Sequence, residues 1–151
     1  MSQRPRALLL CVGLIASVAC TPASSSKRVI ASPHAPAALG AYSQAIRVGN
    51  TTYLAGQLAL DPKTGELIAD ASIEGQTRQA LENLRAVLAA GDMTLDNVVA
   101  TQIFITDISE APRMNSVYAT YFNKLPPARA VVEVTHLARN ARIEISAIAV
   151  E

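Results

Sequence analysis

Near its C-terminal end the sequence reads Arg142-Ile143-Glu144-Ile145-Ser146-Ala147-Ile148-Ala149-Val150. Successive side chains of an extended strand point to opposite faces, so the even-numbered residues share one face and the odd-numbered residues the other. An earlier stretch, Arg129-Ala130-Val131-Val132-Glu133-Val134, has the same strand-like composition. Its alternation places Arg129, Val131 and Glu133 on one face. The two stretches predict a pair of β-strands whose polar side chains gather on particular faces.

Arg129 and Glu144 are costly residues to place on strands that are otherwise apolar. An arginine presents a planar fork that binds a carboxylate through two hydrogen bonds. A glutamate in apolar surroundings can position a water molecule or accept a proton. One interpretation is therefore a pocket for a small acid whose neighbouring carbon is attacked by water. The other is an ion pair of Arg129 with Glu144 or Glu133 at an interface, and spacing alone favours neither.

The composition indicates one domain with part of its surface covered. The chain has 151 residues, which suits a single domain, and 50% of them are hydrophobic. Charged residues make up only 17%, below the usual quarter, so an interface between subunits is expected to hide part of the surface. The formal net charge is +1 and the basic residues are scattered, which gives no reason to expect a nucleic-acid partner.

Residues 1–19 are expected to form a signal peptide rather than part of the fold. Arg4 and Arg6 precede a short apolar run at 7–16, and Ser17-Val18-Ala19 supplies the small residues of a cleavage site. The apolar run is too short for a comfortable transmembrane helix. A buried N-terminal helix or strand is the alternative, but the run has no polar face. The sequence therefore predicts an exported protein.

Cys20 makes this signal more specific. The segment resembles a bacterial lipoprotein signal, in which the mature chain begins at an acylated cysteine, so Cys20 is the expected lipidation site. Leucine is usual three residues before that cysteine, where this chain has Ser17. We therefore expect a lipid-anchored protein of the bacterial cell envelope or periplasm, with a soluble periplasmic or secreted protein as the alternative. Residues 20–27 would form a flexible tether, because they are mostly small and polar.

Residues 28–151 are expected to form the folded domain. Apolar periodicity, caps and turn residues predict, in order, strands at 42–48 and 51–60, a helix at 72–90, a strand at 98–106, a helix at 110–123 and the two C-terminal strands. The order β-β-α-β-α-β-β predicts an α+β fold, a mixed sheet with both helices packed on one face. The open face would be too apolar for water, so we expect it to be buried against neighbouring subunits in a closed ring.

Several blocks of the sequence resemble the RidA family, the YjgF-type enamine/imine deaminases, from about Val29 to Glu151. The blocks occur in the family's order and are Ala35-Pro36-Ala37-Ala38-Leu39-Gly40-Ala41-Tyr42-Ser43-Gln44-Ala45, Leu54-Ala55-Gly56-Gln57, Asp61-Pro62-Lys63-Thr64-Gly65-Glu66, Arg78-Gln79-Ala80-Leu81-Glu82-Asn83-Leu84, Pro127-Ala128-Arg129 and Ile143-Glu144-Ile145. The resemblance implies a chorismate-mutase-like fold assembled as a homotrimer, with active sites in the clefts between subunits. It also implies a 2-iminobutanoate/2-iminopropanoate deaminase-like hydrolase, which converts 2-imino acids or their enamines to 2-oxo acids and ammonia. This chemistry uses no metal or organic cofactor.

The resemblance also assigns roles to residues of this chain. Arg129 matches the arginine that binds the substrate carboxylate, and Glu144 matches the acid that orients or deprotonates the attacking water. Tyr42 matches an aromatic residue that lines the cleft, Gly56 a glycine whose backbone closes on the ligand, and Asn115 an asparagine contributed by the preceding helix. Taken without the resemblance, these last three are an ordinary strand aromatic, a bulge and a solvent-facing helix residue.

Two positions depart from the family pattern. Val131 stands where many members have a cysteine, so no thiol-based role carries over, and Thr135 is larger than the residue common there. His34 and His136 are isolated loop histidines and do not predict a metal site. A non-catalytic envelope protein that binds a small carboxylate or acts as a chaperone is the alternative function. Endoribonuclease activity, associated with some relatives, is least favoured because the charge is near neutral.

Overall fold

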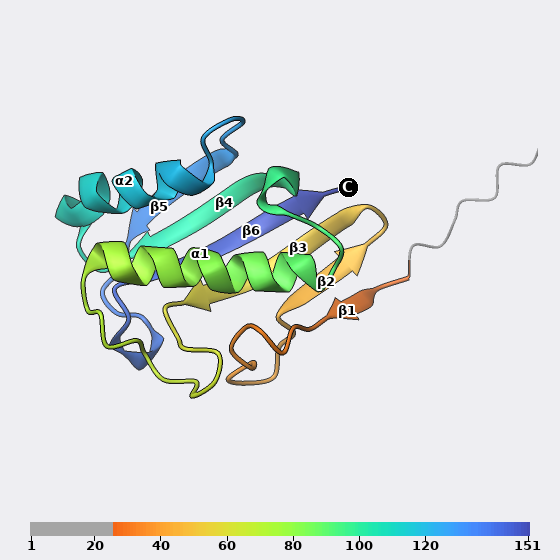
Figure 1. Ribbon diagram of the computed structural model, residues 1–151, viewed down its shortest axis with the longest axis horizontal. Coiled ribbons are helices and arrows are strands. Elements are labelled where there is room, and N and C mark those ends of the chain that lie inside the picture. The colour runs from red at the N-terminus through yellow and green to blue at the C-terminus, as the bar shows by residue number, and fades with distance from the viewer. Residues whose placement is uncertain (1–25) are drawn as a thin grey trace, which may run out of the picture.

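The computed structural model describes residues 26–151, which form one sheet covered by helices (Figure 1). The strands and helices are β1 (Arg28–Ile30), β2 (Ala45–Val48), β3 (Thr51–Leu58), α1 (Ile73–Ala89), β4 (Val98–Ile105), α2 (Ala111–Tyr121), β5 (Ala128–Glu133) and β6 (Ile143–Val150). Three short 3-10 turns lie at Leu95–Asn97, Ile108–Glu110 and Ala138–Asn140. From β2 onward the order is the predicted one, and β1 is an additional strand. No helix within these residues has the length and apolar content needed to cross a membrane.

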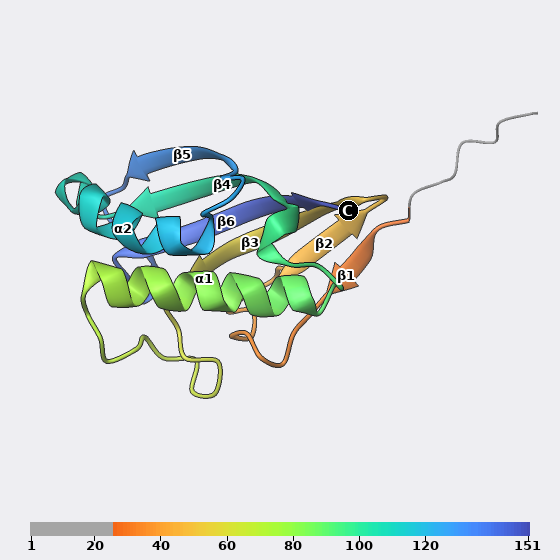
Figure 2. The ribbon, with the colours of Figure 1, turned by 45° about the horizontal axis from the view of Figure 1, so that its top comes forward.

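The six strands form one mixed sheet in the order β1-β2-β3-β6-β4-β5. β4 and β5 are parallel and every other neighbouring pair is antiparallel. Parallel neighbours need a crossover, and α2 provides it between β4 and β5. Figure 2 shows α1 and α2 on the same face of the sheet, so the predicted α+β arrangement is confirmed.

The core lies between the sheet and the two helices. Alternation on β6 is confirmed, because its odd-numbered residues are buried toward the helices: Ile143, Ile145, Ala147 and Ala149. Leu81, Leu84 and Leu88 of α1 are fully buried in the same cluster. Truncation of a buried leucine to alanine usually costs about 2–5 kcal/mol, so this layer contributes strongly to stability.

Polar side chains fix the start of α1 and its contact with β3, the strand that carries Gly56. Ser72 caps α1, since its Oγ accepts from the backbone N–H of Gly75 at 3.0 Å. Asn83 of α1 donates through Nδ2 to the carbonyl oxygens of Leu58 at 3.0 Å and Leu60 at 2.9 Å. Asn83 therefore ties α1 to the end of β3, where the chain leaves the sheet.

The other face of the sheet is open and carries exposed apolar side chains. Tyr53 of β3 is 51% exposed, Val132 of β5 is 48% exposed and Ile148 of β6 is 36% exposed. Tyr53 and Ile148 are direct cross-strand partners. Apolar side chains gathered on one face of a sheet are typical of a protein–protein contact, and burial of this face against neighbouring subunits stays a prediction.

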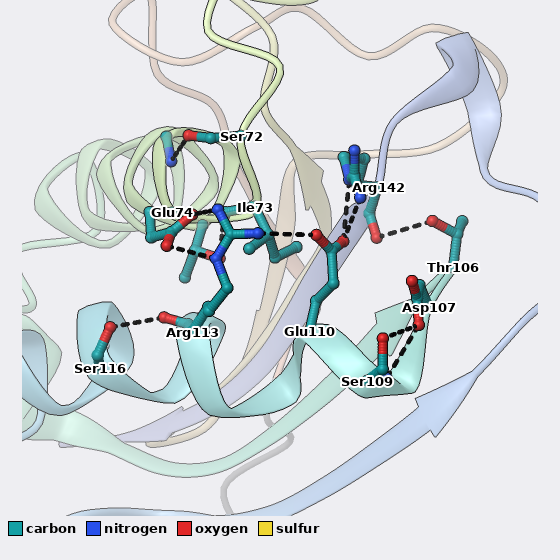
Figure 3. Close-up of polar contacts among 12 residues, drawn as sticks. Ser72, Ile73, Glu74, Thr106, Asp107, Ser109, Glu110, Arg113, Ser116 and Arg142 are labelled. Carbon is teal, nitrogen blue, oxygen red and sulfur yellow. Dashed lines mark hydrogen bonds and ion pairs between the residues drawn. The ribbon is translucent and has the colours of Figure 1, made fainter.

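A network of charged side chains joins the two helices to the start of β6 (Figure 3). The carboxylate of Glu110, in the turn before α2, is buried and accepts from Arg142 Nε at 3.0 Å and also from Arg142 Nη2. Its other oxygen accepts from Arg113 Nη1 of α2 at 3.3 Å. Arg113 in turn donates from Nε and Nη2 to both oxygens of Glu74 of α1, each at 2.7 Å. The network thus fixes Arg142, the residue directly before β6, two positions before Glu144.

Replacing Arg142 with methionine is expected to lower the free energy of unfolding by about 2–3 kcal/mol, because the buried Glu110 carboxylate loses its main partner. Urea unfolding monitored by circular dichroism measures this change. Arg139→Met is the matched control, since Arg139 and Glu66 are both exposed and 3.4 Å apart. That control should change stability by no more than about 0.5 kcal/mol. Equal effects of the two substitutions would contradict a structural role for the Glu110 network.

Candidate functional site

Arg129 lies on β5 with its side chain on the face of the sheet that the helices cover. The strand register places Arg129 beside Thr101 of β4, and Thr101 is buried on that face. The guanidinium carbon of Arg129 is 4.7 Å from the centre of the Tyr118 ring of α2. No carboxylate within residues 26–151 forms an ion pair with Arg129. Its hydrogen-bond donors are therefore free of any acid in the described chain.

A hollow of about 480 Å³ opens beside this arginine. Its lining residues come from α2, from the loop after it and from β5: Asn115, Tyr118, Ala119, Phe122, Pro126, Pro127 and Arg129. The side-chain oxygen of Asn115 is buried and has no hydrogen-bond partner among the described residues. Buried polar atoms are rarely left unpaired, so this oxygen indicates a place where a ligand or water completes the contact. The structure therefore brings Arg129 and Asn115 together.

Glu144 lies on the opposite, open face of the sheet, next to Gly56 of β3. A Cβ atom added to Gly56 would lie 1.8 Å from Glu144 Oε1 and 2.8 Å from its Cγ. The strand register also shifts between Leu54 and Gln57, so Gly56 sits at a bulge. In this subunit, therefore, the missing side chain of Gly56 makes room for Glu144. Burial raises the pKa of the Glu144 carboxyl above its ordinary value.

Tyr42 belongs to the Gly56 side of the molecule. It lies in the loop before β2 rather than on a strand, is half-exposed, and its hydroxyl accepts from the backbone N–H of Leu39 at 3.0 Å. Tyr42, Gly56 and Gln57 line one narrow hollow of about 30 Å³. Glu144 lies next to Gly56 and therefore close to this hollow. Tyr42, Gly56 and Glu144 thus form a second group of candidate residues.

The two groups lie apart within one subunit. Thr101 is the cross-strand partner of both Arg129 and Ala147, which places these residues on the buried face. Glu144 is an odd number of residues from Ala147 and faces the other way. Neither the Arg129–Glu144 nor the Arg129–Glu133 ion pair forms within the described chain, and Glu133 instead accepts from the backbone N–H of Ile108 at 2.9 Å. Arg129 and Glu144 therefore do not meet within the described chain.

Tyr118 is the residue that the sequence did not single out. It is 5% exposed, its hydroxyl is 2.8 Å from Thr101 Oγ1, and its ring contacts Phe122 with centres 4.6 Å apart. Its burial raises its pKa, while the Thr101 hydrogen bond and the charge of Arg129 lower it. The signal was present in the helical spacing, because Asn115, Tyr118 and Phe122 are separated by three and four residues and share one helix face.

The predictions for Val131, for Cys20 and for a metal site remain. Val131 packs against the core cluster beside Arg129. Cys20, the expected lipidation site, lies outside the described residues. Within residues 26–151 no three His, Cys, Asp or Glu side chains gather closely enough to hold a metal ion.

Comparison with known proteins places this geometry in a family. A family model described as Endoribonuclease L-PSP matches residues 32–151. The 2-iminobutanoate/2-iminopropanoate deaminase of Mus musculus is 42% identical over 125 residues, which cover 83% of this chain and 92% of the mouse protein. The solved structure of RidA from an Antarctic Psychrobacter matches with a TM-score of 0.79 at 38% identity, over 82% of this chain and 99% of that one. Escherichia coli TdcF with bound serine matches with a TM-score of 0.78 at 33% identity, over 82% and 98%.

The chain therefore belongs to the RidA/YjgF family, the family described as Endoribonuclease L-PSP. Its mixed sheet with two helices on one face is the fold of the solved RidA structures. Relatives that carry the name of a deaminase are among those it matches. The family predicted from the ordered sequence blocks is confirmed.

Proposed function

We propose that the protein hydrolyses 2-imino acids, or their enamine tautomers, to 2-oxo acids and ammonia. The observation that carries the proposal is the free guanidinium of Arg129 in a hollow with the unpaired side-chain oxygen of Asn115. A guanidinium with no carboxylate partner is suited to bind a substrate carboxylate bidentately. The mouse relative is named for deamination of such imino acids, and TdcF has been solved with serine, a small amino acid, bound.

The complete site, in this proposal, forms between subunits of a homotrimer. Arg129 and Asn115 of one subunit would meet Tyr42, Gly56 and Glu144 of its neighbour. Two observations support this arrangement: the two groups lie on opposite faces of the sheet, and the open face carries exposed apolar side chains. A contact between two different patches of identical subunits generates a ring when its rotation closes. Sedimentation analysis should therefore give three times the mass of one subunit.

The chemistry needs water and side chains only. Arg129 holds the carboxylate of the protonated imino acid and leaves C2 exposed. Glu144 accepts a proton from water as the water oxygen bonds to C2, which gives a carbinolamine. That proton passes to the nitrogen, the C–N bond breaks with its electron pair leaving on ammonia, and the hydroxyl proton is lost as the 2-oxo acid forms. Positioning of the reactants supplies much of the acceleration, and general-base assistance adds about 10²–10⁴-fold. No metal or organic cofactor enters these steps.

Ammonia-release kinetics test the proposal directly. Imines are generated in situ from several amino acids by an amino acid oxidase, and protein beginning near Lys27 is added. We expect ammonia release above the uncatalysed rate, with the rate saturating in imine. A rate equal to that of buffer with every imine would remove the proposed function.

Mixing two inactive variants tests the shared site. An Arg129→Ala subunit keeps Glu144, and a Glu144→Gln subunit keeps Arg129. Random reassembly of equal amounts places both intact residues at about one site in four, because each interface then draws one residue from each neighbour. Recovery to about that fraction of wild-type activity is expected. Absence of recovery in mixed trimers confirmed by mass spectrometry would contradict a site shared between subunits.

Replacing Gly56 with alanine is expected to displace Glu144 and reduce kcat strongly. The new Cβ overlaps the carboxylate and the Cγ of Glu144, so the whole side chain must move. The far end of a glutamate is flexible, so the free energy of unfolding should fall by only about 1 kcal/mol. Gly40→Ala is the matched control, because its Cβ would meet nothing closer than 3.9 Å. An unchanged kcat for Gly56→Ala would contradict the position of the base.

Carboxylate binding without catalysis is the second candidate function. The observation that favours it is that one subunit alone contains the Arg129 hollow but not Glu144 beside it. A protein that does not assemble would therefore bind a small acid and leave it unchanged. Calorimetric titration with 2-oxobutanoate, together with the ammonia assay, separates the two functions, because binding without ammonia release supports this candidate.

We also propose that the protein is exported and anchored through a lipid on Cys20. The support is the sequence of residues 1–20, a basic start, an apolar run and small residues before the cysteine. The family match begins only at residue 32, which leaves this segment outside the shared domain. Mass spectrometry of the mature N-terminus should find an acylated Cys20. A peptide that begins at residue 20 without lipid would instead support a soluble periplasmic or secreted protein.

A further inference from the structure

We infer that Tyr118 is a positioning residue, whose ring holds the guanidinium of Arg129 in place for a substrate carboxylate. This inference deepens the proposed function, on which it rests for the identity of the carboxylate. It concerns a residue that does not itself touch the reacting atoms and acts through Arg129.

The first observation is the contact itself. The guanidinium carbon lies over the Tyr118 ring at 4.7 Å from the ring centre, within the range of a cation–π interaction. The side chain of Arg129 is otherwise exposed, and no carboxylate in the described residues pairs with it. A long arginine side chain loses considerable rotamer freedom when it is fixed. Because the ring already restricts the side chain, less conformational entropy is lost when substrate binds.

The second observation is the chemistry of the contact. A carboxylate beside Arg129 would fix it equally well but would occupy its N–H donors and neutralise its charge. An aromatic ring attracts the flat face of the guanidinium through its quadrupole. The N–H groups at the edge of the guanidinium stay unpaired. The donors remain available for a bidentate contact with an incoming acid. An uncharged support is therefore the kind that a substrate-binding arginine requires.

The third observation is the rigidity of the ring. Tyr118 is 5% exposed, and its hydroxyl is hydrogen-bonded to Thr101 Oγ1 at 2.8 Å in a buried environment. Thr101 is the β4 partner of Arg129 in the sheet, so the strand beside the arginine also fixes the ring. Phe122, one helical turn later, packs against the ring at 4.6 Å between centres. The hydrogen bond to Thr101 and the packing of Phe122 therefore hold the Tyr118 ring in one position.

The test changes the electrons of the ring without changing its shape. The series is Tyr118→Phe, the same position carrying 3,4,5-trifluorophenylalanine, and Tyr118→Leu. Fluorination weakens the quadrupole, so we expect the trifluoro variant to raise KM about two- to fivefold above Tyr118→Phe, with kcat changed less. Tyr118→Leu should raise KM by about tenfold or more, because it also removes the packing. Equal KM values for the phenylalanine and trifluorophenylalanine proteins would overturn the inference.

Tyr121 supplies the matched control on the same helix. Its hydroxyl donates to Glu82 Oε1 at 2.7 Å, on the side of α2 that faces α1. Tyr121→Phe and Tyr121→Leu should leave KM unchanged, whatever their effect on stability. A rise in KM with Tyr121→Leu equal to that of Tyr118→Leu would show a general effect of loosening α2 and would overturn the positioning role.

A measurement of ligand binding tests the role of Tyr118 independently of the proposed reaction. The dissociation constant of 2-oxobutanoate, measured by calorimetry, should follow the same order along the Tyr118 series. If the wild-type protein binds 2-oxobutanoate but releases no ammonia from imines, the reaction fails and the binding series still decides the role of Tyr118. If it releases ammonia and fluorination changes neither KM nor the dissociation constant, the positioning role fails alone.

Discussion

Arg129→Ala is expected to reduce kcat/KM for 2-iminopropanoate by roughly 10²–10⁴-fold, because two charge-assisted hydrogen bonds to the carboxylate are lost. The structure gives the physical reason for so large an effect. No acid in the described chain occupies the guanidinium, so its binding capacity is available to substrate. Ammonia-release kinetics with imine generated in situ measure the change. Arg129→Lys should retain a part of the activity, since lysine keeps the charge but not the planar fork.

Stability separates loss of binding from loss of fold in this experiment. Arg129 is exposed and forms no ion pair in the described chain. Its truncation removes only the contact with the Tyr118 ring, so the free energy of unfolding should change by no more than about 1 kcal/mol. Arg139 is another exposed arginine, and Arg139→Ala should leave kcat/KM unchanged. Hydrolysis at the wild-type rate by Arg129→Ala would remove this residue from the site.

Glu144→Gln is expected to lower kcat by about 10²–10⁴-fold with little change in KM, because the amide fills the same space but accepts no proton from water. In the proposed mechanism the carboxylate form of Glu144 is the active one. Burial raises its pKa, so kcat/KM should fall as the pH decreases through a value above the ordinary 4.5 of glutamate. That acid limb should be absent from the residual activity of Glu144→Gln. An identical acid limb in the two proteins would assign it to another group.

The free energy of unfolding should respond to pH in the opposite sense to kcat/KM. The folded chain holds the Glu144 proton more tightly than the unfolded chain, so the associated stability is present below pH 4.5 and is lost as the pH rises through the raised pKa. Glutamine has no such titration. The stability of Glu144→Gln relative to wild type should therefore improve between pH 4 and pH 7, which urea unfolding at the two pH values measures. A catalytic base kept in a partly buried position at a cost in stability is the expected pattern for a functional carboxylate.

Local patterns determined most of the fold. The alternation in β6 and the three- and four-residue spacing of apolar residues in α1 follow from the backbone geometry of each element, which depends on neighbouring residues only. The turn residues between the strands predicted at 42–48 and 51–60 likewise indicated the β2–β3 hairpin. β1 was missed because a strand of three residues carries too little alternation to recognise, and it exists through its pairing with β2.

The candidate site was only partly contained in local patterns. The sequence identified Arg129 and Glu144 by the cost of placing charge on apolar strands, and the family resemblance added Tyr42, Gly56 and Asn115. It did not show that Arg129 and Glu144 face opposite ways. Alternation fixes which residues share a face within one strand, whereas the relation between two strands depends on their register and on β4, which lies between β6 and β5.

The sequence by itself therefore determined the elements, the α+β class and the residues with unusual chemistry, because each of these follows from composition and short-range spacing. Only the tertiary structure decided which residues meet. It placed the carboxylate of Glu144 in the space that Gly56 leaves, and the ring of Tyr118 beneath Arg129. Glu144 and Gly56 meet through the pairing of β3 with β6, and Tyr118 and Arg129 meet through the packing of α2 on the sheet. No local pattern encodes either of these.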